Sequence, residues 1–295
     1  MKKYTVGVIG LGNMGKGIAK NFSKKNYHLA VWDVSSAACK SFRKSNSVQF
    51  LEPVEMAKFC RTIFLVVPGS AEIEKILKGK KGILNNARQG LVLYDLTTSD
   101  PVHTKRLAKK AAKKKVSYLD AGMSGGASGA EAGNLTLMIG GKEEAYIETR
   151  KHLKVFAANL FYLGDSGAGH TLKLIHNMVC HTIFLATCEG GRMAELAGIR
   201  LEDMIDVFNL ANARSYISET RFPKHILSKK WDAKSKVSNL HKDLKMAVSL
   251  SKSLGTNPDL GEQTLLFLEN AVAQGMENDD FSLLFRDFQK IKDAS

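Results

Sequence analysis

The sequence predicts a two-part α/β protein, with a parallel β-sheet domain over residues 1–165 and an all-α domain over residues 166–295. Three observations predict this fold class. Short β-rich apolar segments alternate with helix-length segments in the first part, a glycine-rich turn follows the first apolar segment, and apolar residues recur at helical spacing in the second part. A chain of 295 residues with 44% hydrophobic content is long enough to form two such cores.

Seven segments of the first part have the apolar, β-rich composition of buried strands. In chain order they are YTVGVI (4–9), HLAVWD (28–33), TIFLVV (62–67), LVLYDL (91–96), VSYLDA (116–121), LTLMIGG (135–141) and NLFYLG (159–164). Because helix-length segments separate most of them, we expect parallel strands with helices on both faces of the sheet.

The second part has no β-rich segments. Apolar residues recur at helical spacing for about thirty residues, from Ser166 as a candidate cap to Gly198 as a stop signal. Further helical segments are expected at about 201–212, 236–254, 259–275 and 281–292. The second domain should therefore be helical throughout and begin with one long interdomain helix.

The composition argues against two function classes. The net charge of +14 comes from 43 basic and 29 acidic residues, and clustered lysines occur in nucleic-acid-binding proteins. The densest basic run, KRLAKKAAKKK at 105–115, has apolar residues at helical spacing, as in a solvated amphipathic helix. The longest apolar runs, such as IFLVV at 63–67, are far shorter than a membrane span of about 18 to 20 residues. We expect a soluble protein that binds neither nucleic acid nor membrane.

Cysteine usage indicates a cytoplasmic protein without a metal site. The chain has four cysteines, Cys39, Cys60, Cys180 and Cys188. They show no metal-ligand spacing, and we expect them to be reduced. The N-terminal MKKYTVGVIGLG begins like a signal peptide, but Asn13 and Lys16 interrupt its apolar segment early. It is interpreted as the first strand.

The stretch VIGLGNMGKG at 8–17 contains the spacing G-x-G-x-x-G directly after the first strand. Gly10 would allow a tight turn, Gly12 a close approach of a pyrophosphate, and Gly15 close packing of the following helix. The second strand ends in Asp33, 18 residues after Gly15, where a carboxylate can bind the adenine-ribose hydroxyls and repel a 2′-phosphate. The alternative is that Asp33 only caps a helix in VSSAACK. The pattern favours a Rossmann-type domain that binds NAD through a turn of Gly10, Leu11, Gly12, Asn13, Met14 and Gly15.

Four segments resemble the signature segments of the β-hydroxyacid dehydrogenases, which include the 6-phosphogluconate dehydrogenases. They are GLGNMG (10–15), DLTTSDP (95–101), DAGMSGGASGAEAGNLTLMIGG (120–141) and GAGHTLKLIHN (167–177). KDLKMAVSLSKSLG (242–255) and DDFSLLF (279–285) resemble the 3-hydroxyisobutyrate dehydrogenase branch of that family. The resemblance covers the whole chain in order.

The resemblance implies roles for individual residues. Lys173 would be the catalytic acid/base, with Asn177 one helical turn further on. The substrate carboxylate would be bound by Ser124, Gly125 and Gly126. Further cofactor contacts would come from Val67, Pro68, Thr98 and Lys242.

Elementary chemistry supports two of these roles. Lys173 and Asn177, at i and i+4, project from one face of a helix. The backbone N–H groups after Ser124 can form an anion-binding nest. The alternative for Lys173 is a surface lysine at the end of a helical stripe. The alternative for the segment that begins at Ser124 is a flexible turn without a ligand.

The sequence departs from the family pattern at several positions. The usual string has proline and valine in place of Gly122 and Met123, so the floor of the acid pocket is expected to differ. His170 and His176 resemble 6-phosphogluconate dehydrogenase, but Cys180 stands where that enzyme uses a glutamate. A thiol is a poor acid for enol protonation, which argues against a phosphorylated sugar acid as substrate.

The resulting hypothesis is an NAD-dependent oxidoreductase that interconverts a small β-hydroxy acid and its semialdehyde and assembles as a homodimer or homotetramer. One alternative is an NADP-linked reductase of succinic or tartronate semialdehyde, which Asp33 and the lack of an arginine after it disfavour. The other is a non-catalytic nucleotide-binding module, against which the presence of Lys173 argues.

Overall fold

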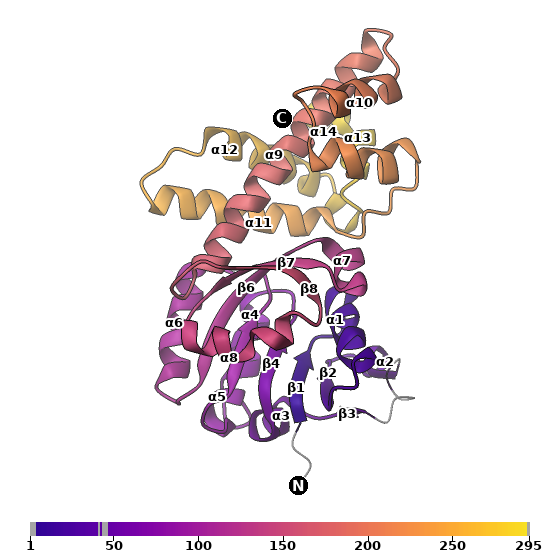
Figure 1. The fold of residues 1–295 in the computed structure, drawn as a ribbon. Helices are drawn as coiled ribbons and strands as arrows, with labels where there is room; N and C mark the ends of the chain where they lie inside the picture. The colour runs from indigo at the N-terminus through magenta and orange to yellow at the C-terminus, as the bar shows by residue number, and fades with distance from the viewer. Residues whose placement is uncertain (1–3, 41, 43–46, 294–295) are drawn as a thin grey trace. The chain divides into compact units, whose positions relative to one another are not determined.

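The computed structural model describes residues 4–40, 42 and 47–293, so residues 1–3 of the expected first domain lie outside it. The chain divides into two compact units at Lys173/Leu174 (Figure 1). This division falls inside the long helix α9 (Ala168–Leu196), which begins a few residues after the boundary expected from the sequence.

The first unit is built on an eight-stranded sheet in the order β3-β2-β1-β4-β5-β6-β7-β8 (Figure 1). The strands are β1 (Tyr4–Ile9), β2 (Leu29–Trp32), β3 (Val48–Phe50), β4 (Cys60–Leu65), β5 (Val92–Asp95), β6 (Ser117–Ser124), β7 (Leu135–Gly140) and β8 (Ala157–Tyr162). All seven expected strands are present. The edge strand β3 was missed because it has three residues, two of them exposed, and such a segment has no recognisable period.

One strand pair departs from the expected parallel arrangement. β6 and β7 are antiparallel, whereas the other neighbouring pairs of named strands are parallel. Only residues 125–134 connect them, and these include the short helix α7 (Gly126–Ala132). A parallel crossover needs a dozen or more residues, so this connection allows only the antiparallel pairing.

Helices cover both faces of the sheet. They are α1 (Asn13–Lys24), α2 (Ser36–Lys40), α3 (Pro53–Phe59), α4 (Ser70–Leu77), α5 (Ile83–Asn86), α6 (Pro101–Ala112), α7 and α8 (Glu143–Leu153). Successive residues of β4 alternate between two cores: Phe64 packs with α1 and α8, while Ile63 and Leu65 pack with α3, α4 and α6. The basic run lies largely on α6, where Leu107 is buried and its lysines are exposed, as an amphipathic helix requires.

The second unit is helical in its described part. Besides α9 it contains α10 (Leu201–Leu210), the π-helical segment η1 (Ile217–Leu227), α11 (Val237–Ser253), α12 (Asp259–Ala273), the 3₁₀ turn η2 (Met276–Asn278), α13 (Leu283–Arg286) and α14 (Phe288–Lys292). The segment η1 was not expected, since Pro223 inside it is a helix breaker in sequence terms. The helix expected at 281–292 is interrupted at Asp287. No helix in the described chain is long and apolar enough to span a bilayer.

The buried His152 makes the stability of the first unit sensitive to acid. Its Nδ1 lies 3.1 Å from the Thr62 hydroxyl, and burial lowers its pKa from 6.5 to about 4. Between these two values the unfolded chain binds a proton that the folded chain does not, so stability falls as the pH is lowered through this window. We expect the free energy of unfolding in urea to fall from pH 7 to pH 5 less steeply in His152→Gln than in the native protein. Equal pH dependence of the two proteins would contradict this assignment.

Candidate active site

The candidate residues of the first unit lie at one edge of its sheet. The strand order changes direction at β1, whose neighbours are β2 and β4, and loops from the carboxyl ends of parallel strands meet at such a point. The glycine-rich turn follows β1, Asp33 follows β2, Val67 and Pro68 follow β4, and Thr98 follows β5. The topology therefore brings together segments that are far apart in the sequence, in the place where this fold binds ligands.

Each glycine of the turn after β1 meets a different requirement. Gly10 has φ +93°, and a Cβ there would lie 2.1 Å from the carbonyl oxygen of Val66. A Cβ on Gly15 would lie 1.8 Å from the carbonyl oxygen of Gly10, so the start of α1 packs directly on the turn. A Cβ on Gly12 would meet nothing within 4 Å. The turn is closely packed toward the protein and open at Gly12, which fits a dinucleotide pyrophosphate.

Asp33 joins the glycine turn to the end of β2. Its Oδ2 accepts a hydrogen bond from the Leu11 N–H at 2.6 Å, and its Oδ1 accepts one from the Ser35 N–H at 2.7 Å. The second bond closes a turn within the loop before α2, which begins at Ser36, so Asp33 is not at the N-cap position of that helix. The first bond fixes the carboxylate beside the turn after β1. Asp33 therefore combines a local turn contact with a position beside the glycine turn.

The segment predicted to bind the substrate carboxylate directly follows β6. Ser124 is the last residue of that strand, and Gly125 and Gly126 have φ values of +121° and +63°. These left-handed conformations favour glycine. The backbone here turns sharply between β6 and α7, the kind of geometry in which successive N–H groups form a nest.

Lys173 lies on α9 and is only 9% exposed, unlike the lysines of the basic run. The start of its helix is fixed to the sheet by the buried Asp120, whose carboxylate accepts hydrogen bonds from the N–H groups of Gly167 (2.7 Å) and His170 (2.9 Å). The buried His170 ring lies 2.8 Å from the Thr104 hydroxyl. The burial of Lys173 argues against the alternative that it is a surface lysine. The His170 ring contacts α6 through Thr104, which accounts for its burial.

Asn177, one turn after Lys173, belongs to a polar network of the helical unit. Its Nδ2 donates a hydrogen bond to Asp243 Oδ2 at 2.7 Å, and both side chains are buried. Lys242 lies on the same helix α11, with its Nζ 3.5 Å from Asp243 Oδ1. The Asn177 Oδ1 lies 3.0 Å from His176 Nδ1. Both polar atoms of the Asn177 side chain, Nδ2 and Oδ1, therefore have a polar partner.

Sequence reasoning missed Asp120 and Asp243. Both belong to segments quoted for the family resemblance, yet no spacing rule assigns a function to a single carboxylate in a strand or helix. Each of the two is an acidic residue within an otherwise buried stretch. A buried carboxylate requires a partner for its charge, and this is the signal that could have identified them.

Only one of the two departures from the usual family string faces the candidate catalytic lysine. Met123 packs against the core between the sheet and α1, on the face of β6 opposite to Gly122. A Cβ on Gly122 would lie 2.5 Å from the Cβ of Lys173. The expected difference in the pocket floor therefore concerns Gly122 and not Met123.

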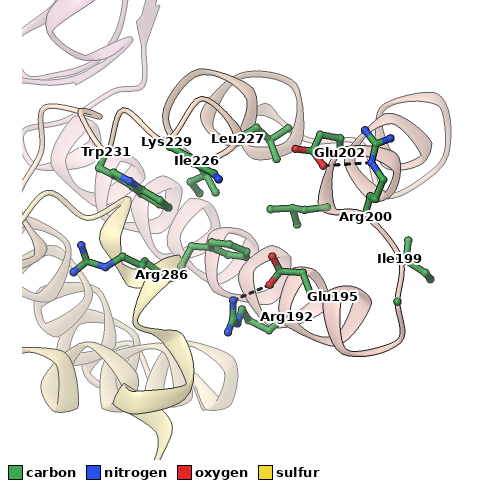
Figure 2. Close-up of a pocket in the computed structure, with 13 residues that line it drawn as sticks. Arg192, Glu195, Ile199, Arg200, Glu202, Ile226, Leu227, Lys229, Trp231 and Arg286 are labelled. Carbon is green, nitrogen blue, oxygen red and sulfur yellow. Dashed lines mark hydrogen bonds and ion pairs between the residues drawn. The ribbon is translucent and has the colours of Figure 1, made fainter.

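A separate cavity of about 540 Å³ lies within the helical unit (Figure 2). Trp231, Ile226 and Phe285 contribute apolar surface to its lining, and ion pairs such as Arg192–Glu195 contribute charged groups. None of the predicted site residues lines it. Within the described residues, no group of three or more His, Cys, Asp or Glu side chains is placed to hold a metal ion.

Two family models together match almost the whole chain. The family model described as the NAD binding domain of 6-phosphogluconate dehydrogenase matches residues 5–164. The model described as NAD-binding of NADP-dependent 3-hydroxyisobutyrate dehydrogenase matches residues 167–287.

Individual relatives agree with these families. The chain is 32% identical to a probable mitochondrial 3-hydroxyisobutyrate dehydrogenase from Dictyostelium discoideum, over 95% of this chain and 89% of that protein. It is 27% identical to a 2-(hydroxymethyl)glutarate dehydrogenase from Eubacterium barkeri, over 100% of this chain and 98% of that protein. The crystal structure of a 3-hydroxyisobutyrate dehydrogenase from Salmonella typhimurium superposes with a TM-score of 0.86 at 26% identity, covering 96% of this chain and 99% of that one.

Proposed function

The chain belongs to the β-hydroxyacid dehydrogenase family, and on this premise we propose that it oxidises a small β-hydroxy acid to its semialdehyde with NAD, and catalyses the reverse reduction. The first candidate substrate is 3-hydroxyisobutyrate. The observation that carries the proposal is Lys173, a largely buried lysine anchored beside β6, the strand that ends in the predicted carboxylate-binding segment.

The cofactor would be held by the turn from Gly10 to Gly15 and by Asp33, with further contacts from Val67, Pro68, Thr98 and Lys242. When bound, the nicotinamide supplies the acceptor or donor of the hydride. The residues fit this group because Gly12 leaves space at the turn and Asp33 is fixed next to it.

The chain's own residues would hold the substrate and move one proton. Ser124 and the N–H groups of Gly125 and Gly126 would bind the carboxylate through charge-assisted hydrogen bonds. Lys173 Nζ would accept the proton of the hydroxyl as the hydride leaves the carbinol carbon, and would return it to the carbonyl oxygen in the reverse direction. Asn177, held by Asp243, would orient the reacting oxygen.

A substrate panel tests this proposal. Purified protein should reduce NAD with 3-hydroxyisobutyrate and should be inactive with 6-phosphogluconate. The second expectation follows from Cys180, a thiol where decarboxylation of a phosphorylated sugar acid requires a carboxylic acid. Turnover of 6-phosphogluconate at a comparable kcat/KM would contradict the proposed substrate class.

Cofactor preference follows from Asp33. A carboxylate fixed beside the turn repels a 2′-phosphate, so kcat/KM with NAD should exceed that with NADP by at least roughly tenfold, about 1.4 kcal/mol. The measurement is the ratio of the two values in the native protein and in Asp33→Asn, where the ratio should shrink. Equal use of both cofactors by the native protein would favour the NADP-linked alternative.

We further propose a homodimer or homotetramer in a reducing compartment such as the cytoplasm. Large apolar side chains of the helical unit are exposed in the single chain, among them Leu196, Leu210 and Leu260. Cys60 and Cys188 are buried thiols that form no disulfide. Light scattering after size exclusion would give the oligomeric state.

A further inference from the structure

The two faces of β6 have different roles. Leu119, Ala121 and Met123 point into the core between the sheet and α1. Because successive side chains of a strand alternate, Asp120, Gly122 and Ser124 share the opposite face. We call these three positions the α9 face of β6, because contacts of Asp120 and Gly122 with residues 167–173 lie on it.

The start of α9 approaches this face at backbone distance. Asp120 binds the N–H groups of Gly167 and His170. A Cβ on Gly169 would lie 2.2 Å from the carbonyl oxygen of Met138 and 3.0 Å from that of Asp120. No space for a further side chain remains between the helix and the sheet here.

Gly122 provides the space for the stem of Lys173. A Cβ at this position would lie 2.5 Å from the Cβ and 2.9 Å from the Cγ of Lys173. Gly122 is not among the residues with positive φ, so its backbone conformation does not itself require glycine. The close contact with Lys173 is therefore the reason for a glycine here. A proline, the usual family residue, carries a Cβ for which this structure has no room, so the close seat of the lysine stem on β6 is a feature of this chain.

We propose that Gly122 is a positioning residue, which sets the location of the Lys173 amine by letting the lysine stem lie directly on β6, and that Asp120 is the second anchor. This inference rests on the acid/base role proposed for Lys173. Gly122 and Ser124 are two residues apart, about 6.5 to 7 Å along the strand, which a lysine side chain can span. The single strand β6 thus fixes the distance between the proton-transfer group and the carboxylate-binding segment.

The test adds one methyl group at each of two glycines. Gly122→Ala places a Cβ against Lys173, whereas the control Gly190→Ala adds a methyl to α9 where nothing lies within 4 Å. Displacing a catalytic group by about 1 Å lowers the rate by about 10²-fold, so we expect that loss in kcat for Gly122→Ala only. The pH profile of kcat should also shift, which a loss of folded protein alone would not cause. The Kd for NAD should stay within about twofold.

A second readout does not depend on turnover. Competitive acetylation by acetic anhydride, followed by mass spectrometry, gives the reactivity of Lys173 against pH relative to the exposed lysines. We expect this curve to shift in Gly122→Ala and to match the native curve in Gly190→Ala. If Gly122→Ala fails to bind NAD, Asp120→Asn, which keeps the size of the side chain and one acceptor oxygen, provides the comparison.

The outcomes separate this inference from the proposed function. A shifted acetylation curve supports the positioning role even if the native protein turns over no hydroxy acid, a result that would contradict the proposed function alone. A native acetylation curve in Gly122→Ala, or in Asp120→Asn where that variant is needed, overturns the positioning role whatever the value of kcat.

Discussion

Replacing Lys173 with alanine should lower kcat on the best hydroxy acid by about 10²- to 10⁴-fold, the usual contribution of a positioned acid/base group. The affinity for NAD should remain nearly unchanged, because the glycine turn and Asp33 belong to the loops after β1 and β2, whereas Lys173 lies on α9. The measurement is paired: NAD affinity by fluorescence titration, and kcat by NADH formation.

A matched control removes a lysine elsewhere in the first unit. Lys154 is exposed at the end of α8, and Lys154→Ala should retain native kcat. If Lys173→Ala binds NAD and also retains kcat, Lys173 is a buried structural lysine and the catalytic assignment is wrong.

Removing the charge of the substrate carboxylate should have the second largest effect. The amide of an accepted hydroxy acid should lose at least about 10²-fold in kcat/KM, since charge-assisted hydrogen bonds contribute about 1.5 to 3 kcal/mol each. Ser124→Ala should reduce kcat/KM for the acid more than for the amide. Neutral alcohols that react as well as the acids would refute a carboxylate site after β6.

The sequence was informative wherever a local pattern determines the structure. Gly10, Gly12 and Gly15 could be assigned different roles because each step of the turn has its own steric demand. The geometry shows that demand at Gly10 and Gly15, and the approach of a pyrophosphate at Gly12 stays a prediction. The strand segments were recognisable because buried parallel strands form continuous apolar runs. The residue roles inferred for Lys173, Ser124 and Asn177 came from family resemblance and stay predictions.

Features that depend on distant contacts were not predictable. Nothing near Asp120 in the sequence indicates that its carboxylate binds the start of a helix some fifty residues later, and the same holds for Asp243 and Asn177. For β7 the cause is a misplaced strand end: the strand expected at 116–121 extends to Ser124 in the structure, and only the shorter connection that remains excludes a parallel crossover. The short edge strand β3 is defined by its pairing with β2, and its own composition does not indicate a strand.

The most direct test of the central claim follows one hydrogen atom. 3-Hydroxyisobutyrate with both hydrogens of its carbinol carbon replaced by deuterium is incubated with the native protein and NAD, and the reduced cofactor is examined by mass spectrometry. The proposed reaction predicts one deuterium in each NADH formed, because the hydride moves directly from that carbon to the nicotinamide. If the protein binds NAD but forms no NADH with this or any other short hydroxy acid, or if the NADH carries no deuterium, the proposed function is contradicted.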